Sequence, residues 1–431
     1  MSQYKLLVRS AKQVVTVRNN GVKVVCGKDM QVLDVIDGDD NDGVNILINK
    51  SGKIEFVGKK SKFEEKYKNL TVDVEIDATG KCVIPGLVDA HTHPVWAGDR
   101  VHEFAMKLAG ATYMDVHKAG GGINFTVEHT RAASEDLLYT GLKQRLLNMM
   151  STGTTTVECK SGYGLEVDTE VKMLKVIDRA SKEIPITISS TFLGAHSVPR
   201  GKTPNEATND VISVQLPKIV KLMSDGLLKV DNIDVFCEKG VFDVDQSKRI
   251  LVAGKDAGLQ INFHGDELHP LEGAEMGAEL GALAISHLEE ISEKGIKAMV
   301  EAGSVGVVLP TTAYILRIKP PPVRLMIDSG MAVALGSDYN PNAHCSSMPM
   351  VMHLACVLMH MSMPEALIAA TLNAAAALGL SETHGTIEVG KYGDMVVIDA
   401  YRWEHLIYQL GSHDKLINCV IRNGDIVYQK V

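Results

Sequence analysis

Between residues 87 and 338 the chain repeats one pattern, in which an apolar run of strand length is followed by a longer stretch with helical spacing. This alternation predicts β-α units and a parallel sheet, because parallel strands need a crossover connection that is usually a helix. Eight runs carry the strand pattern: 87–91, 154–159, 186–193, 232–237, 260–264, 282–287, 305–309 and 332–336. The clearest helical patterns between them lie at 135–150, 168–182 and 244–257. Eight such units over about 250 residues are typical of a (β/α)8 TIM barrel, so we predict an α/β protein built on one.

Short β patterns separated by Gly, Asn and Asp occur at both ends of the chain. They lie at 5–8, 13–17, 44–48, 53–57 and 72–76 before the barrel, and at 385–387, 395–399 and 418–428 after it. Either group alone would leave sheet edges exposed, so we expect the two groups to combine. The predicted organisation is a small composite β-sandwich domain from residues 1–86 and 385–431, with the barrel domain at 87–384.

Charge and composition limit the partners that the chain is expected to have. A net charge of -9 argues against a nucleic-acid or anionic-membrane surface. The apolar stretch 348–380 is interrupted by two histidines, a proline and an asparagine, which favours a buried helix pair over a membrane span. The seven cysteines are scattered without a C-x-x-C pair, and residues 1–15 lack a signal-peptide pattern. We therefore expect a cytosolic protein with reduced thiols and a small-molecule substrate.

Polar side chains gather where the predicted barrel strands end, and the chemistry of such barrels sits at these C-terminal ends. Five of the eight ends carry a histidine or a carboxylate: His91 with His93, His196, His264 with Glu267, His287, and Asp338. His91 and His93 are two residues apart, so in an extended strand both imidazoles point to one face. Ligands that converge from distant strands are what a metal site requires.

The predicted metal ligands are three imidazoles and one carboxylate: His91, His93, His264 and Asp338. This set suits one divalent cation, Zn2+ or iron (2+ or 3+), with room for a water whose pKa such an ion lowers to ~7. Glu267 is placed to move a proton, and His287 to donate to a carbonyl or carry a proton, with Asp338 as the third predicted catalytic group. The structural alternatives are a loop salt bridge for Glu267 and a packed, backbone-bonded histidine for His287.

The strings around these residues resemble the amidohydrolase superfamily and, within it, the imidazolonepropionase family. The matching strings are HTHPVWAGDR at 91–100, KSGYGL at 160–165, FLGAH at 192–196 and SDYNP at 337–341. The metal pattern is shared with many deaminases, whereas the SGYGL string and the placement of Arg100 are more specific. The resemblance implies hydrolysis of the cyclic amide of 4-imidazolone-5-propanoate to N-formimidoyl-L-glutamate, a reaction of L-histidine degradation. It also implies a homodimer.

The same resemblance implies the substrate contacts. Arg100 would bind the propionate carboxylate, which suits a planar guanidinium, and Tyr163 and His196 would face the imidazolone ring. Asn340 and Asn342 complete the predicted contacts. Asn342 and Ala343 stand where bacterial relatives tend to have Gly followed by Thr or Ser, so here the chain departs from the family pattern.

Two other functions are compatible with parts of this pattern. A purine or pyrimidine aminohydrolase with one metal ion would share the fold and the ligands. A metal-free scaffold is the second alternative, but it would be expected to have lost ligands, and every candidate ligand is present. Lys160 is not expected to bridge two metals, because it ends the second predicted strand and the bridging lysine of binuclear amidohydrolases belongs to the fourth.

Overall fold

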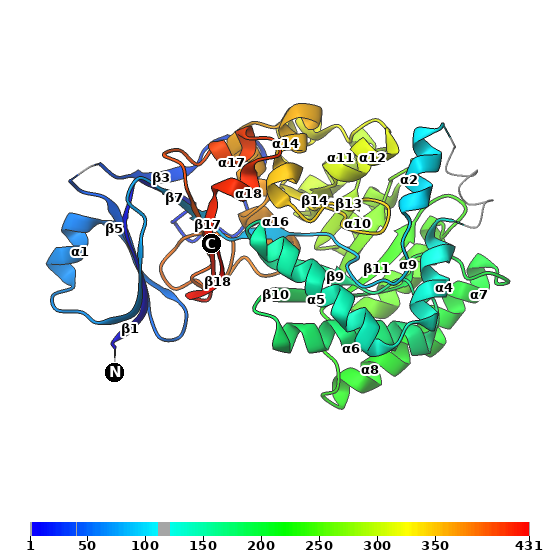
Figure 1. The fold of residues 1–431 in the computed structure, drawn as a ribbon. Helices are drawn as coiled ribbons and strands as arrows, with labels where there is room; N and C mark the ends of the chain where they lie inside the picture. The colour runs from blue at the N-terminus through cyan, green and yellow to red at the C-terminus, as the bar shows by residue number, and fades with distance from the viewer. Residues whose placement is uncertain (1, 40, 111–120, 431) are drawn as a thin grey trace.

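The computed structural model describes residues 2–39, 41–110 and 121–430. Its largest part is a barrel of parallel strands enclosed by helices (Figure 1). The barrel strands are β8 (Leu87–Asp89), β9 (Thr154–Lys160), β10 (Thr187–Ala195), β11 (Asn232–Cys237), β12 (Gln260–Gly265), β13 (Ala284–His287), β14 (Val305–Val308) and β15 (Val333–Leu335). Each pairs in parallel with the next along the chain, so the eight predicted strands are confirmed.

The barrel is joined between its first and last strands by a seam of hydrogen bonds. The backbone N–H of Asp338 donates to the His91 carbonyl (2.9 Å), and that of His93 donates to the Tyr339 carbonyl (2.9 Å). The carboxylate of the buried Asp89 accepts the backbone N–H (2.8 Å) and the hydroxyl (2.5 Å) of Ser337. Burial raises the pKa of Asp89 to about 7. The seam therefore sets the end of β8 directly against the residues that follow β15.

Helices cover the outside of the barrel (Figure 1). They are α2 (Val101–Leu108), α4 (Ile123–Ala132), α5 (Glu135–Ser151), α6 (Val167–Glu183), α7 (Pro204–Asp210), α8 (Leu216–Ser224), α9 (Val244–Asp256), α10 (Gly273–Leu280), α11 (Glu293–Ala302), α12 (Pro310–Leu316) and α13 (Val323–Asp328), with a π-helical turn at Val211–Gln215. The predicted helices are confirmed as α5, α6 and α9. Side-chain caps define the starts of α5 and α9: the side chain of Ser134 accepts the Leu137 N–H, and Asp243 forms a capping box with Gln246.

The apolar stretch after the barrel forms three short helices rather than the expected pair. These are α14 (Met348–Met359), α15 (Met363–Ala369) and α16 (Leu372–Ala377). His360 adopts a left-handed conformation (φ 57°) that ends α14, and a capping box between Ser362 and Glu365 starts α15. Within the described residues, no helix is both long and apolar enough to cross a membrane.

Two further sheets lie beside the barrel. One, in the order β5-β4-β1-β6, contains β1 (Tyr4–Ala11), β4 (Val44–Ile48), β5 (Ile54–Lys59) and β6 (Val72–Asp77). The other, in the order β18-β17-β16-β7-β2-β3, contains β2 (Gln13–Val17), β3 (Asp34–Asp37), β7 (Cys82–Pro85), β16 (Met395–Ile398), β17 (Ile417–Arg422) and β18 (Asp425–Gln429). Three short helices lie near them: α1 (Lys60–Lys66), α17 (His405–Tyr408) and α18 (His413–Leu416). A 3-10 helix at Gly27–Gln31 packs instead against α13 and α15 of the barrel.

The two sheets combine both ends of the chain, as expected. β16 pairs antiparallel with β7, and Leu6, Ile46, Val397 and Ile421 belong to one apolar cluster. The strand predicted at 385–387 is wrong. Gly385 turns the chain at φ +88°, and this segment makes a single backbone bond to the nearby sheet, from Ile387 N–H to the Thr16 carbonyl (3.3 Å). The side chain of Ile387 is nevertheless buried in the shared cluster.

Candidate active site

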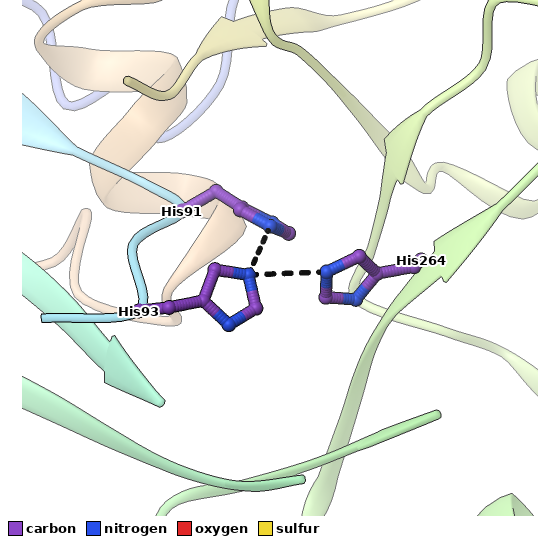
Figure 2. Close-up of side chains that lie close together, drawn as sticks. All are labelled: His91, His93 and His264. Atoms are coloured by element: carbon purple, nitrogen blue, oxygen red, sulfur yellow. Dashed lines mark hydrogen bonds between the residues drawn. The ribbon is translucent and has the colours of Figure 1, made fainter. Parts of the chain in front are cut away.

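Three imidazoles meet at the C-terminal ends of β8 and β12. The Nε2 atom of His93 lies 3.3 Å from Nε2 of His91 and 3.2 Å from Nε2 of His264 (Figure 2). One ring nitrogen from each histidine lies within 4.8 Å of the others, and all three rings are buried. Burial lowers the pKa of each well below its ordinary value, so the imidazoles are neutral at pH 7. Neutral imidazole is the form that binds a metal ion, so this cluster fits one.

The fourth predicted ligand lies beside the cluster. Asp338 Oδ1 is 3.6 Å from His91 Nε2 and 3.4 Å from His93 Nε2. Its other oxygen accepts a hydrogen bond from the hydroxyl of Thr312 (2.5 Å), which leaves Oδ1 facing the imidazoles. Asp338 has a left-handed backbone (φ 49°), as do Asp266 and His287 (φ 50° and 79°). Strained conformations of this kind at several strand ends are typical of functional sites. No sequence pattern singles out Thr312.

Glu267 and His287 form a second pair at the same end of the barrel. Glu267 Oε2 lies 3.6 Å from His287 Nε2, and Glu289 Oε2 lies 3.7 Å from His287 Nδ1. Burial raises the pKa of Glu267 to about 8. Burial lowers the pKa of His287, but Glu267 and Glu289 outweigh it and raise that pKa to about 10. The two groups therefore titrate as one coupled pair, as a site for proton transfer requires.

The loop that carries Glu267 is held on both sides. The carboxylate of Asp266 accepts the backbone N–H groups of Leu271, Gly273 and Ala274, at 2.8–3.1 Å. The buried carboxylate of Glu238 accepts the Leu268 N–H (2.9 Å) and the Nδ1–H of His269 (2.8 Å). Glu267 therefore sits between two anchored segments, which fixes its backbone relative to the imidazoles.

A cavity of about 250 Å3 opens over the imidazole cluster. Its lining includes His93, His264, Glu267, His287, Thr312 and Asp338, the apolar side chains Ile123, Phe236, Leu268, Leu316 and Ile318, and the five predicted substrate contacts Arg100, Tyr163, His196, Asn340 and Asn342. The structure thus brings every predicted site residue except the buried His91 to the wall of one cavity, with His91 just beneath it. The role of each residue stays a prediction.

Arg100 is held by a carboxylate that the sequence did not reveal. Its Nε and Nη2 donate to the two oxygens of Glu103 at 2.9 and 2.8 Å, and both side chains are buried. Glu103 also accepts the N–H of Gly122 (2.8 Å) and lies in the first turn of α2, where a negative charge is favoured. Among the described residues, Arg100 Nη1 has no hydrogen-bond partner. One edge of the guanidinium therefore faces Glu103, and the other is available to a second carboxylate.

The loop around Tyr163 wraps around a buried carboxylate. Glu170 accepts the backbone N–H groups of Gly162 (3.1 Å), Gly164 (2.7 Å) and Leu165 (2.8 Å). Gly162 has φ +111°, and a Cβ at Gly164 would lie 2.6 Å from the Glu170 nitrogen, so both positions require glycine. This arrangement explains the KSGYGL string and directs Tyr163 to the cavity wall. Glu170 was not identified from the sequence, although it lies in the first turn of the helix after the loop.

His196 and Asn340, two more predicted substrate contacts, differ in whether their polar atoms are used within the protein. The Nδ1–H of His196 donates to the Gly162 carbonyl (3.0 Å), and its ring stacks on His93 with centroids 4.8 Å apart. Burial lowers the pKa of His196 to about 4, so its Nε2 is an acceptor at neutral pH. The amide of Asn340 bonds within its own loop, to the Asp338 carbonyl and to the N–H groups of Asn342 and Ala343. Asn340 therefore shapes the loop that presents Asn342.

Known proteins match this chain over nearly all of its length. The model of the amidohydrolase family matches residues 82–427. Similar relatives named "Probable imidazolonepropionase" come from Danio rerio (62% identical, covering 99% of this chain and 98% of the relative), Mus musculus (60%, 100% and 100%) and Homo sapiens (59%, 99% and 99%).

Solved structures share the fold at lower identity. An adenosine deaminase from Xanthomonas campestris with bound zinc aligns with a TM-score of 0.73 at 17% identity, over 98% of this chain and 92% of that chain. The guanine deaminase of E. coli aligns with a TM-score of 0.69 at 17% identity, over 99% of both. At this identity the likeness shows the fold alone. The family match and the full-length relatives show that this chain belongs to the amidohydrolase family, in the group whose members are named probable imidazolonepropionase.

Proposed function

We propose that this chain is a metal-dependent hydrolase that opens the cyclic amide of 4-imidazolone-5-propanoate to give N-formimidoyl-L-glutamate, a reaction of L-histidine degradation. The names of its full-length relatives support this proposal. The observation that carries it is a buried arginine, Arg100, on the wall of the cavity that holds the imidazole cluster. A neutral nucleobase has no need for this cation, whereas a propionate arm does.

One divalent ion per subunit, zinc or iron, would be held by His91, His93, His264 and Asp338. Bound there, such an ion supplies polarisation of the ring carbonyl and a lowered pKa for water. The remaining steps belong to the side chains. Hydrolysis adds hydroxyl to the carbonyl carbon and a proton to the departing ring nitrogen, so a proton must cross the site.

Glu267 is the residue proposed to carry that proton, since it lines the cavity together with His93 and His264. With its pKa raised to about 8, the carboxyl group both accepts and returns a proton near neutral pH. His287, protonated at neutral pH, donates a hydrogen bond to the carbonyl oxygen as negative charge develops there. Asp338 Oδ1 accepts from water on the other side.

Arg100 would bind the propionate through the guanidinium edge that Glu103 leaves available. A carboxylate that enters a partly dehydrated cavity must recover its lost solvation from a charged donor. The Nε2 of His196 accepts a ring N–H, and Tyr163 packs against the ring. These contacts orient the ring carbonyl toward the imidazole cluster.

The test is Arg100→Met, assayed with the full substrate and with an imidazolone that lacks the carboxylate. Loss of a charge-assisted hydrogen bond should raise KM for the full substrate by about 10- to 100-fold. The variant should discriminate far less than the wild type between the two compounds. Arg200→Met, which removes an exposed arginine paired with Glu128, is the matched control and should leave KM unchanged. Equal discrimination by wild type and Arg100→Met would remove the main support for this substrate.

No observation in the structure favours the alternative, a purine or pyrimidine aminohydrolase. The solved deaminases share its fold, and their 17% identity carries no argument about substrate. Ammonia release from a panel of nucleobases and nucleosides would establish that activity.

The metal, the location and the assembly complete the proposal. Elemental analysis of the purified protein distinguishes zinc from iron. All seven cysteines are free, which supports a reducing cytosol. A homodimer is expected from the family and is tested by sedimentation of the purified protein.

A further inference from the structure

A buried chain of charges lies behind one of the three imidazoles. The Nδ1–H of His264 donates to Asp234 Oδ1 (2.9 Å), and the backbone N–H of His264 donates to the same oxygen (3.0 Å). The other oxygen of Asp234 accepts from Lys160 Nζ (2.8 Å), which also donates to Glu158 Oε1 (2.8 Å). Lys160 and Glu158 are fully buried, and Asp234 is 1% exposed. Four side chains thus form one path that ends at a predicted ligand.

The path follows from the strand pattern. Glu158 and Lys160 are two apart on β9, so both point to the same face, and Asp234 lies on β11. From the strand between them, Thr191 adds a hydroxyl that donates to Glu158 Oε1 (2.6 Å). Side chains of β9 and β11, which are not neighbours in the sheet, can meet only inside the barrel. The charges therefore lie in the barrel interior, below the imidazole cluster.

The three imidazoles differ in how they are held. Within the described part of the chain, Nδ1 of His91 and Nδ1 of His93 have no hydrogen-bond partner. His264 alone of the three has a carboxylate at Nδ1. A proton fixed at Nδ1 leaves the lone pair at Nε2, and this atom faces the cluster 3.2 Å from Nε2 of His93.

Lys160 stabilises the buried Asp234 carboxylate inside the barrel. A buried carboxylate without a counter-charge is strongly disfavoured. Among the described residues, Asp234 has only the His264 imidazole and the His264 backbone N–H as partners besides Lys160. Burial lowers the pKa of Lys160, but Asp234 and Glu158 outweigh it and raise that pKa above its ordinary value. Lys160 therefore stays charged and holds Asp234 as an acceptor. Its Nζ is committed to two carboxylates, which agrees with the expectation that it bridges no metals.

We propose that Asp234 and Lys160 are positioning residues that hold His264 in the tautomer and orientation of a metal ligand. Lys160 acts through Asp234 and does not touch the metal. The inference rests on the metal site of the proposed function and does not depend on which substrate the enzyme takes.

The experiment measures Zn2+ affinity by competition with a chromophoric chelator, without substrate, in wild type, Asp234→Asn and Lys160→Met. Removal of an outer-sphere partner of this kind weakens metal binding about 10- to 100-fold, and we expect both variants in that range. Because both act through one path, the double variant should lose little more than the worse single variant. In 15N-histidine spectra of the metal-free protein, the His264 ring should be protonated at Nδ1 in wild type and a tautomer mixture in both variants.

Lys172→Met is the matched control. Lys172 donates to three backbone carbonyls away from the cavity, so its loss should lower Tm and leave Zn2+ affinity unchanged. Affinities within twofold of wild type in both site variants, or an unchanged His264 tautomer, would overturn the inference. If Lys160→Met fails to fold, the near-isosteric Asp234→Asn decides by the same two readouts. A wild type that binds no Zn2+ would instead count against the metal site of the proposed function.

Discussion

The two large interiors of this molecule are built from different chemistry. Inside the barrel, Glu158, Lys160 and Asp234 form a charged network beneath the imidazoles. The amide of Asn262 on β12 reaches Glu158 across the barrel (3.4 Å). The cluster between the two terminal sheets, with Ile46 and Val397, is aliphatic. The barrel interior thus buries charged side chains beneath the proposed metal site, whereas the interior between the sheets buries apolar side chains. Substitutions in the two places should fail in different ways.

The largest effect is expected from His264→Ala. It removes the one imidazole of the cluster whose Nδ1 has a hydrogen-bond partner among the described residues, so most bound metal and nearly all activity should be lost. The barrel should persist, because helices and neighbouring strands still bury its outer face. Elemental analysis, turnover and circular dichroism check these three outcomes. Full metal occupancy in the variant would contradict the ligand assignment.

Glu267→Gln should have the next largest effect. The amide keeps the size of the side chain but cannot titrate, so kcat should fall by ~10²–10⁴ while the metal content stays at the wild-type level. Steady-state kinetics on metal-analysed protein gives both numbers. An unchanged kcat would make Glu267 a structural carboxylate and assign the proton transfer to Asp338 or His287.

Val397→Ala probes the aliphatic cluster between the sheets. Deleting two buried methyl groups should cost about 2 kcal/mol of unfolding free energy, with kcat and KM unchanged. Val74→Ala, the same change at a side chain that is 41% exposed on β6, is the control and should cost much less. Denaturant unfolding and kinetics measure the two properties separately. A changed kcat in Val397→Ala would contradict the expectation that substitutions between the sheets affect stability alone.

The smallest effect concerns charge on the outside of the barrel. Arg324 on α13 holds Glu365 with two hydrogen bonds of 2.9 Å. Burial raises the pKa of Glu365, but these bonds and the cap at Ser362 outweigh it, so the folded-state pKa is lowered. A lowered carboxyl pKa contributes stability that is present above the unfolded-state pKa and is lost as pH falls through the folded-state value.

Glu365→Gln should therefore flatten the loss of stability on acidification below about pH 4.5, the ordinary region of a glutamate. Arg324 is 36% exposed, so the contribution should not exceed about 1 kcal/mol. Unfolding curves of wild type and variant at pH 7 and pH 4 give the difference. A larger change in unfolding free energy for Glu365→Gln than for substitutions in the barrel interior would contradict this ranking.

The barrel could be predicted because segments of strand length alternate regularly with helical patterns, although Glu158, Thr191 and Asp234 interrupt the apolar residues of three strands. The proposed metal ligands could be identified because they stand at or just beyond the ends of those strands. The strand predicted at 385–387 is wrong because three residues with one buried isoleucine are too few to show the two-residue alternation of a strand. The strand at Asp34–Asp37 was missed, because two acidic residues flank its short apolar centre.

Residues that position other side chains could not be predicted from the sequence. Thr312, Glu103 and Asp234 have no motif of their own, and their partners become neighbours only after folding. The sequence indicates that Lys160 does not bridge two metal ions. It does not indicate that Lys160 pairs with Asp234, because Asp234 lies 74 residues away. Arg100 was singled out by family resemblance rather than by spacing.

The seam at Asp89 and Ser337 has a consequence for the order in which the protein becomes functional. These partners are 248 residues apart, and the proposed metal ligands His91 and Asp338 lie on either side of the same seam. Closing so long a loop comes late and slowly, because its entropy cost precedes any reward from the contacts. We therefore expect β8, with His91 and His93 just after it, to remain in an open sheet until β15 has been made. The four proposed ligands can come together only once the circle of strands is complete, so we expect metal loading to report on barrel closure.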